Sequence, residues 1–317
     1  MLVSILIPCF NAKRWIGQAI ESALAQTWSA TELIVVDDGS TDGSLNVIKG
    51  FGSRIQWETG PNRGGNPARN RLLELARGGW VQYLDADDCL LPEKVAAQVE
   101  FLKDHPEADV IFGPVTLEHW SERKPERALL PIPEPHDEWV LLARWYLPQT
   151  GSPLWRKQAI LDVGGWNPNQ ASCQEHELYL RLLTGDKRLV YCPANGAVYR
   201  QWSEGTVWKR DRAKTRERRL AIVRQAESFL TGRGLLSAER RRAINEGRFE
   251  CARMAWPEDR DEARCIIDEI HRSQPNFLPV GIAAPPEYRL LYRWLGFDAT
   301  ETVAAWRRRW ARAPCIA

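Results

Sequence analysis

The stretch Glu32–Asp42, ELIVVDDGSTD, carries the strongest fold signal in the chain. Its run of Leu, Ile and Val shows no alternation with polar residues, which is typical of a strand covered on both faces. Val3–Ile7, VSILI, has the same character, and apolar residues recur at helical spacing between Ile16 and Leu24. Strand, helix and strand joined by short connections form a right-handed parallel unit. The sequence therefore predicts an α/β fold, Rossmann-like, with a mostly parallel sheet.

The alternation of strands and helices continues to about residue 115. Helices are expected at 41–49 and from residues 67 and 92, with strands at 55–57, 80–84 and 110–115. Six prolines between residues 125 and 153 then interrupt any long element. We expect an irregular loop there, with a short helix at 139–145.

A second region begins near residue 206, where the pattern becomes helical and rich in arginine. Helices are expected at 211–230, 237–256, 257–272, 286–295 and 298–312. Residues 1–205 hold 20 basic and 26 acidic residues, a net charge of −6, whereas the rest holds 23 and 15, a net charge of +8. We therefore predict an α/β domain over 1–205 and a basic α-helical C-terminal region over 206–317.

Composition limits the class of protein. The chain has 317 residues, of which 44% are hydrophobic and 26% charged, so it can bury a core and is not a disordered protein. No apolar stretch approaches the roughly 20 residues that cross a bilayer. The seven cysteines are odd in number and widely spaced, without a Cys-x-x-Cys pair. We expect reduced thiols in a cytoplasmic protein.

Two acidic clusters directly follow predicted strands, where ligands bind in an open parallel sheet. The first is Asp37-Asp38-Gly39-Ser40, which a turn and a helix cap would also explain. The second is Asp85-Ala86-Asp87-Asp88. Three carboxylates so close together repel one another unless a cation neutralises them, which favours Mg²⁺ or Mn²⁺ over an exposed acidic loop.

Five segments in order resemble family 2 glycosyltransferases of GT-A fold, over roughly residues 2–204. These segments are VSILIPCFN (3–11), SALAQT (22–27), ELIVVDDGSTD (32–42), NRGGNPARN (62–70) and WVQYLDADD (80–88). The resemblance implies a metal-dependent, inverting hexosyltransferase of the kind used in polysaccharide biosynthesis. Its cofactor would be Mn²⁺ or Mg²⁺. Its donor would be a UDP-, dTDP- or GDP-linked sugar, and its acceptor a hydroxyl of a glycan, a lipid-linked saccharide or a small molecule.

The resemblance also implies roles for individual residues. The donor nucleotide would lie against Pro8, Asn11, Asp37, Asp38, Arg69, Asp85 and Asp87. The metal ion on the diphosphate would be held by Asp87 or Asp88, and spacing does not decide between them. The physical reason is that a cation stabilises the negative charge that develops on the leaving diphosphate.

The resemblance also implies a general base, through a further match at Gly164-Gly165-Trp166 and then QEHELYLR over residues 174–181. The family pattern has an acidic pair here, and alignment on Leu178, Leu180 and Arg181 puts Glu175 at the base position. Gln174 departs from the pattern, and a shift of one residue would make His176 the base instead. Trp166 is the tryptophan expected to face the acceptor, with core packing as the alternative.

Many relatives carry a histidine near Trp202 that this chain lacks in Val198–Thr206. Arg200 is expected either to compensate by binding a phosphate or to form a structural ion pair. The altered base and the missing histidine leave a second hypothesis open, a nucleotide-sugar-binding protein with impaired catalysis. A nucleotidyltransferase or dehydrogenase is disfavoured because no glycine-rich phosphate loop follows a strand.

The C-terminal segment 298–312 combines Trp306 and Trp310, four residues apart, with four arginines. This composition is typical of a helix at an anionic membrane surface, so peripheral association with the inner membrane face is one prediction. Docking of this helix on the catalytic domain or on a second subunit is the other. No nucleic-acid partner is expected, because the arginines come without a binding module.

Overall fold

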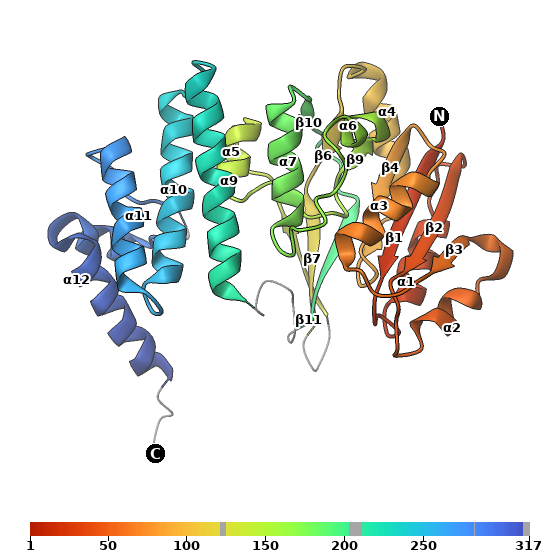
Figure 1. Cartoon of the computed structure of the whole chain (residues 1–317), viewed down its shortest axis with the longest axis horizontal. Helices are drawn as coiled ribbons and strands as arrows, with labels where there is room; N and C mark the ends of the chain where they lie inside the picture. Colours follow the sequence, from red (N-terminus) through yellow and green to blue (C-terminus); the bar gives the residue numbers. More distant parts are fainter. Residues whose placement is uncertain (121–124, 203–210, 282, 313–317) are drawn as a thin grey trace. The chain divides into compact units, whose positions relative to one another are not determined.

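The computed structural model describes residues 1–120, 125–202, 211–281 and 283–312 (Figure 1). These residues form two compact units. The first unit takes residues 1–138 and the described residues from Tyr146 to Trp202, and the second takes 139–145 together with 211–312. The predicted domain boundary at 205 and 206 lies outside the described residues, so it stays a prediction.

A seven-stranded sheet forms the centre of the first unit, in the order β10-β6-β9-β4-β1-β2-β3. Its strands are β1 Val3–Cys9, β2 Thr31–Asp37, β3 Gln56–Thr59, β4 Trp80–Tyr83, β6 Val110–Phe112, β9 Leu154–Arg156 and β10 Leu189–Tyr191. β1 pairs in parallel with β2 and β4, and β2 with β3. Between β4 and β6 the short strand β9 runs antiparallel to both. The predicted mostly parallel α/β sheet is confirmed.

The helices of the first unit cover the sheet because their apolar residues recur on one side. They are α1 Ile16–Leu24, α2 Ser44–Lys49, the 3₁₀ turn η1 Gly52–Arg54, α3 Gly65–Leu75, α4 Lys94–Asp104, α6 Lys157–Asp162 and α7 Gln174–Thr184. Ile16, Ala19 and Ile20 of α1 are fully buried in one core cluster with the inward residues of β1 and β2. This continuous burial explains why β1 and β2 read as unbroken apolar runs.

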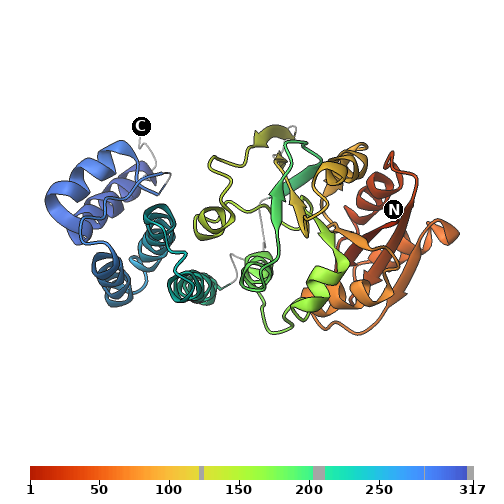
Figure 2. The ribbon, with the colours of Figure 1, turned by 90° about the horizontal axis from the view of Figure 1, so that it is seen from above.

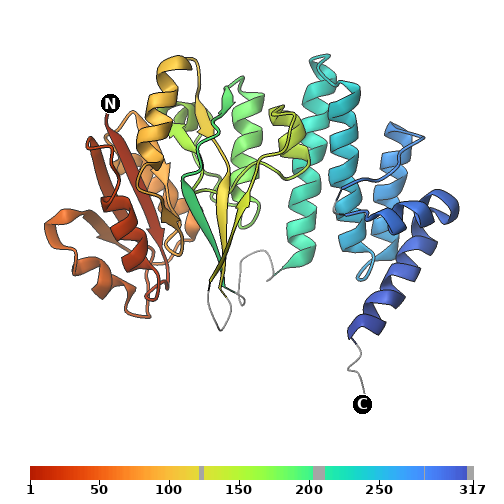
Figure 3. The ribbon, with the colours of Figure 1, turned by 180° about the vertical axis from the view of Figure 1, so that it is seen from behind.

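A second, four-stranded sheet has the order β5-β11-β7-β8. Its strands are β5 Cys89–Leu90, β7 Val115–Trp120, β8 Glu126–Leu130 and β11 Ala197–Trp202. β7 and β11 lie side by side in parallel (Figure 3). The sequence predicted an irregular loop after residue 125, and β8 corrects that prediction. β5 immediately follows the second acidic cluster, so β11 lies next to that cluster.

The second unit is helical, with α5 Glu138–Ala143, α9 Arg212–Gly232, α10 Ala238–Ala255, α11 Arg260–Ser273 and α12 Pro286–Arg312. Figure 2 shows α9 and α10 nearly end-on. Asp211, Ser237 and Asp259 cap the starts of α9, α10 and α11 by accepting backbone hydrogen bonds. Residues 139–145, where the sequence predicted a short helix, all belong to this unit. Trp139 stacks on Phe229 of α9.

The C-terminal element α12 consists of two helical segments that meet at a kink at Gly296, whose φ of 71° is outside the helical range. The break lies between the two helices predicted at 286–295 and 298–312, so that prediction is confirmed. Phe297, Thr300 and Glu301 are buried in the second unit, and Glu301 pairs with Arg253 of α10. This part of α12 therefore docks on the helices of its own unit. None of the helices in the described ranges is long and apolar enough to span a bilayer.

Candidate functional site

The carboxyl ends of β1, β2 and β4 lie at one edge of the main sheet. The register places Cys9 beside Asp37 and Leu6 beside Tyr83, so the residues that follow these strands meet there. The structure therefore brings the two acidic clusters and the segment after β1 to a common edge. Side-chain contacts decide which of these residues remain available to a ligand.

The first acidic cluster shapes the loop after β2. Asp38 is buried, and its two carboxylate oxygens accept hydrogen bonds from the backbone N–H groups of Arg63 and Gly64, both at 2.8 Å. Asp37 is buried as well and accepts from Thr59 at 2.7 Å. A Cβ on Gly39 would lie 2.7 Å from the backbone nitrogen of Asn62, so this close approach needs glycine. Both acids thus anchor backbone at the edge of the sheet.

The segment after β1 is joined to the same loop. The Asn11 side chain accepts from the backbone N–H of Thr41 at 2.8 Å, and the Asn11 N–H donates to Ser40 Oγ at 2.9 Å. Asn11 is exposed and Pro8 half-buried. Phe10, which the sequence analysis did not select, is 50% exposed between them. An apolar ring left exposed directly after a buried strand was the signal that could have found it.

The second acidic cluster is more deeply buried than an acidic surface loop would be. Asp88 is 2% exposed, and Asp85 and Asp87 are half-buried. Burial, and then the charge of Asp85, raises the pKa of Asp87. Burial and the charges of Asp87 and Asp85 raise the pKa of Asp88 well above its ordinary value. A bound cation would relieve this cost of desolvation and repulsion.

Strand β11 supplies partners to two of these acids. The backbone N–H of Arg200 donates to Asp88 Oδ1 at 2.8 Å, and Trp202 Nε1 donates to Asp87 Oδ2 at 3.1 Å. Asp88 Oδ2 is buried and has no hydrogen-bond partner among the residues that the structure describes. Asp87 is the more accessible of the two, so it is the better placed to meet a ligand.

The acids fit a divalent ion that is shared with a substrate. Within the described ranges, no group of three or more His, Cys, Asp and Glu side chains is arranged to hold a metal ion. Mg²⁺ in nucleotide sites is usually bound by one or two carboxylates together with substrate phosphates. Asp87, with Asp88 behind it, matches that smaller ligand set, and the oxygen of Asp88 that lacks a partner is consistent with it.

Arg69 connects the acidic cluster to the helix that carries the predicted base. Its guanidinium donates to Asp85 at 2.9 Å and to Gln174 Oε1 at 2.8 Å. Burial alone would lower the pKa of Arg69, but the charges of Asp85 and Glu175 outweigh this and raise it. Arg69 is 6% exposed, with its guanidinium 4.8 Å from the centre of the Trp166 ring. The side chain of Arg69 is thus enclosed by protein groups, and its predicted contact with the donor nucleotide stays a prediction.

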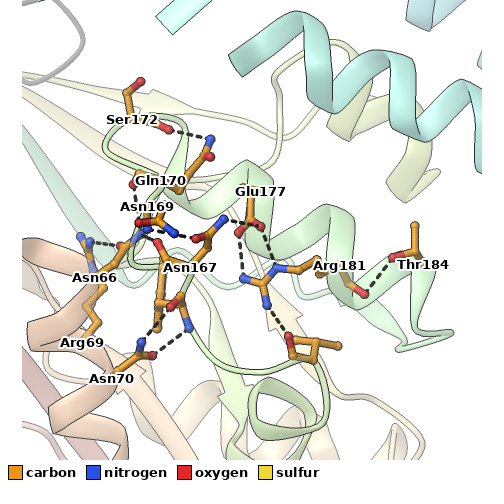
Figure 4. A network of polar contacts seen from close by, with 12 residues as sticks. Asn66, Arg69, Asn70, Asn167, Asn169, Gln170, Ser172, Glu177, Arg181 and Thr184 are labelled. Atoms are coloured by element: carbon orange, nitrogen blue, oxygen red, sulfur yellow. Dashed lines mark hydrogen bonds and ion pairs between the residues drawn. The ribbon is translucent and has the colours of Figure 1, made fainter. Parts of the chain in front are cut away.

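A polar network fixes the turn that precedes α7 (Figure 4). Asn66 donates to the carbonyl oxygens of Asn167 and Gln170, at 2.7 and 3.1 Å. Asn70 both donates to and accepts from the backbone of Trp166, at 2.7 and 2.8 Å. Gly165 has a φ of 75°, and a Cβ there would lie 2.8 Å from Asn70 Oδ1. The turn and α3 therefore pack too closely for any other residue.

Glu175, the predicted base, lies in the first turn of α7 and is half-buried. Its Oε1 accepts a 2.5 Å hydrogen bond from Thr150, a buried residue that the sequence analysis did not select. His176, the alternative base, is 7% exposed and packs edge-to-face on Tyr179. Of the two, Glu175 is the more accessible to solvent, which favours it as the proton acceptor.

Two predicted contacts with ligands do not match the geometry. Trp166 is 0% exposed and packs against Tyr83 and Trp155, so it supports the site from beneath and does not face an acceptor. Arg200 is 8% exposed and donates to Glu118 at 2.9 Å. Two roles were left open for Arg200, and this geometry favours the structural ion pair over binding of a phosphate.

A pocket of about 460 Å³ lies next to Asp87, on the side of Trp202. It is lined by Asn11, Ala12, Lys13, Arg14, Trp15, Asp42 and Trp202. Lys13, Arg14 and Asp42 are exposed, so the rim of the pocket carries two cationic groups and one carboxylate. The pocket therefore combines cationic and indole groups beside the acidic cluster.

Solved structures share this fold. A crystal structure of S. aureus TarS residues 1–349 in complex with UDP-GlcNAc matches with a TM-score of 0.61 and 15% identity, covering 98% of this chain and 92% of that one. Mannosyltransferase PcManGT from Pyrobaculum calidifontis, in complex with GDP-Man and Mn²⁺, matches with a TM-score of 0.52 and 16% identity, covering 98% and 88%. The fold is therefore that of the GT-A class of nucleotide-sugar transferases.

Sequence comparison gives a match within that class. Residues 4–155 match the family model described as Glycosyl transferase family 2, so this part of the chain is similar to that family. An uncharacterized glycosyltransferase of Haemophilus influenzae is 38% identical over 105 residues, which are 32% of this chain and 42% of the relative. Chondroitin synthase of Escherichia coli is 38% identical over 107 residues, which are 32% and 16%. The chain thus spans less than half the length of these curated relatives.

Proposed function

We propose that this protein is a metal-dependent, inverting glycosyltransferase that moves a sugar from a nucleotide-sugar donor to a hydroxyl acceptor. The observation that carries the proposal is the bridge from Asp85 through Arg69 to Gln174. This bridge joins the acidic cluster to the first turn of α7, where Glu175 lies. A cation-binding group and a single proton acceptor in one site are what a one-step displacement requires.

The donor nucleotide is assigned to residues at and just after the end of β1. Half-buried Pro8 and exposed Phe10 and Asn11 offer an apolar surface and an amide at the carboxyl edge of the sheet. Asp37 and Asp38 support the nucleotide site indirectly, because their hydrogen bonds hold the loop against which the base and ribose would lie. Complexes of two structural relatives with UDP-GlcNAc and with GDP-Man support a nucleotide sugar as donor. The donor is therefore proposed to be a UDP-, dTDP- or GDP-linked sugar.

Asp87 is proposed to hold Mn²⁺ or Mg²⁺ on the donor diphosphate, with Asp88 supporting it from the buried side. The ion would stabilise the negative charge of the departing diphosphate. The complex of PcManGT with GDP-Man and Mn²⁺ supports this choice of metal. Arg69 fixes Asp85 and thereby the start of the acidic cluster.

Glu175 is proposed to accept the proton of the acceptor hydroxyl. The acceptor oxygen forms a bond to the anomeric carbon while the bond from that carbon to the diphosphate breaks. The proton passes to a carboxylate oxygen of Glu175, and the nucleoside diphosphate leaves with the bonding electrons. Because only one displacement occurs, the configuration at the anomeric carbon inverts. Thr150 orients the carboxylate through its hydrogen bond to Oε1.

Two substitutions separate donor binding from transfer. Glu175→Gln should lower kcat by about 10³-fold, because it removes the base, and should leave donor affinity unchanged. Asp87→Ala should abolish the dependence of donor affinity on Mn²⁺ in calorimetry. Full activity of Glu175→Gln would remove this residue from its role, and Mn²⁺-dependent binding that survives Asp87→Ala would reject the metal site.

A nucleotide-sugar-binding protein with impaired transfer is the second candidate. Gln174, which stands where the family pattern has an acid, is already hydrogen-bonded to Arg69, and Arg200 is used by Glu118. In both cases an arginine already binds a protein group, so fewer charged side chains remain available to bind a substrate. Donor binding without turnover in the wild-type protein, across a panel of saccharide and lipid-linked acceptors, would favour this candidate.

A further inference from the structure

Helix α12 has one face inside the second unit and one face outside it. Tyr288, Tyr292 and Phe297 are at most 6% exposed and belong to the core cluster around Phe249. On the other face, Leu290, Trp294 and Leu295 are 62%, 76% and 52% exposed. The first two are four residues apart on the helix, so they are neighbours, and Leu295 follows directly. The outer face of α12 thus presents a cluster of large apolar side chains, which we call the α12 patch.

Uncommitted arginines accompany the α12 patch. Arg289 and Arg293 are exposed, and neither forms an ion pair with any residue within the described ranges. Several other arginines of the unit do pair with carboxylates. Arg253 pairs with Glu301 and Arg264 with Asp298, and both of these acids lie on α12. Two free positive charges therefore lie beside the exposed indole and leucines, with Glu287 as the nearby acid on the first turn.

The part of α12 after Gly296 also exposes an apolar side chain next to an arginine. Trp306 is 60% exposed, and Arg307 is exposed with no ion pair in the part of the chain that the structure describes. The sequence predicted a membrane contact over 298–312, but Thr300 and Glu301 are 0% exposed and fasten that stretch to α10. The side chains of residues 308–312 lie outside the described residues. The structure thus moves the centre of the exposed apolar surface to residues 290–295.

We propose that the α12 patch docks the protein on an anionic phospholipid surface. Tryptophan and leucine enter the boundary between headgroups and acyl chains, and the neighbouring arginines contact acidic headgroups. A polybasic contact of this kind requires negative lipid charge. Charge complementarity favours this occupant over a second copy of the chain, which would bring the same arginines against one another. The inference concerns a surface of the helical unit and does not depend on the proposed transferase activity.

The test is cosedimentation of the full chain with vesicles of phosphatidylglycerol and phosphatidylcholine, and with vesicles of phosphatidylcholine alone. The wild-type protein should bind the anionic vesicles and bind neutral vesicles at least about tenfold more weakly. Leu290→Ser with Trp294→Ser should lower binding to anionic vesicles by about tenfold or more, because the inserted apolar area is lost. Arg289→Gln with Arg293→Gln should lower it by a similar factor and make it less sensitive to salt.

Leu235→Ser is the matched control, because Leu235 is 49% exposed in the same unit but lies outside α12. It should bind like the wild type, and circular dichroism should show all variants folded. Equal binding to neutral vesicles, or binding that survives Leu290→Ser with Trp294→Ser, overturns the proposal. Self-association that this double substitution abolishes, in a protein that binds no vesicles, overturns it in favour of a second copy.

Discussion

Two carboxylates at the edge of the sheet have raised pKa values, whereas in the helical unit a partly buried carboxylate has a lowered pKa. At the edge, Asp87 and Asp88 have raised pKa values because burial and neighbouring carboxylates oppose their ionisation. In the helical unit burial also opposes ionisation of Glu227, but hydrogen bonds from Arg248 lower its pKa. Within the first unit, Glu118 follows the second pattern, since Trp120, Arg127 and Arg200 surround it.

This difference distinguishes carboxylates that are neutralised by protein groups from carboxylates that a bound ligand could neutralise. A buried ion pair with both partners present is internally compensated, whereas a carboxylate with a bare buried oxygen is not. The acids at the sheet edge are therefore the place where binding a cation would recover the largest electrostatic cost. Substitutions that remove the same kind of group in the two regions should have opposite effects on stability.

The largest effect is expected in the helical unit. Glu301→Ala leaves the Arg253 guanidinium without its buried carboxylate, and Glu301 is 0% exposed. The free energy of unfolding should fall by about 3 kcal/mol or more, measured by chemical denaturation followed by helical circular dichroism. Asp298→Ala on the same helix removes an ion pair with Arg264 that is about half exposed on both sides. That control should cost less than about 1 kcal/mol, and equal losses would contradict the comparison.

An intermediate effect is expected on activity from a residue that orients the proposed base. Thr150→Val removes the hydroxyl that donates to Glu175 Oε1. On the proposed mechanism kcat should fall about fivefold with KM for the donor unchanged, since one hydrogen bond contributes about 1 kcal/mol. Thr150→Ser keeps the hydroxyl and should restore most of kcat. A change in KM alone would mean that Thr150 acts on donor binding and not on the base.

The smallest effect has the opposite sign to the first. Asp88→Asn removes a charge whose Oδ2 has no partner in the described ranges, so at pH 8 in the presence of EDTA the variant should be more stable by about 1 kcal/mol. Because the folded-state pKa of Asp88 is raised, the folded protein holds this proton more tightly than the unfolded chain. Wild-type stability from this group therefore falls as pH rises from the ordinary carboxylate range through the raised pKa. Denaturation at pH 5 should show a smaller gain, and destabilisation at both pH values would contradict the comparison.

The sequence predicted the strands whose signal is local. β1 and β2 are seven-residue strands with mostly apolar residues at their centres, and their parallel pairing follows from the helix between them. β9 has only three residues and is defined by pairing with β4 and β6, far away in the chain. All five residues of β8 are exposed, so no buried face marks it as a strand. Short or exposed strands depend on long-range pairing that periodicity does not contain.

The candidate site divides in the same way. The position of the acids at the sheet edge was predictable because they directly follow strands. The environments of Arg69, Trp166 and Arg200 were not, since each depends on partners more than 15 residues away in sequence, such as Asp85, Tyr83 and Glu118. Thr150 was missed for the same reason, as its hydroxyl meets Glu175 only in the folded chain.

Gly165 has a consequence for how the site tolerates change. A single methyl group at this position would press against Asn70, whose amide holds the Trp166 backbone in both directions. The displacement would reach the segment that leads into α7, and so the carboxylate of Glu175, without any alteration of a reacting group. The close packing of the turn on α3 thus depends on the absence of a side chain at residue 165. Gly165→Ala would lower turnover by displacing α7, although residue 165 does not take part in the reaction.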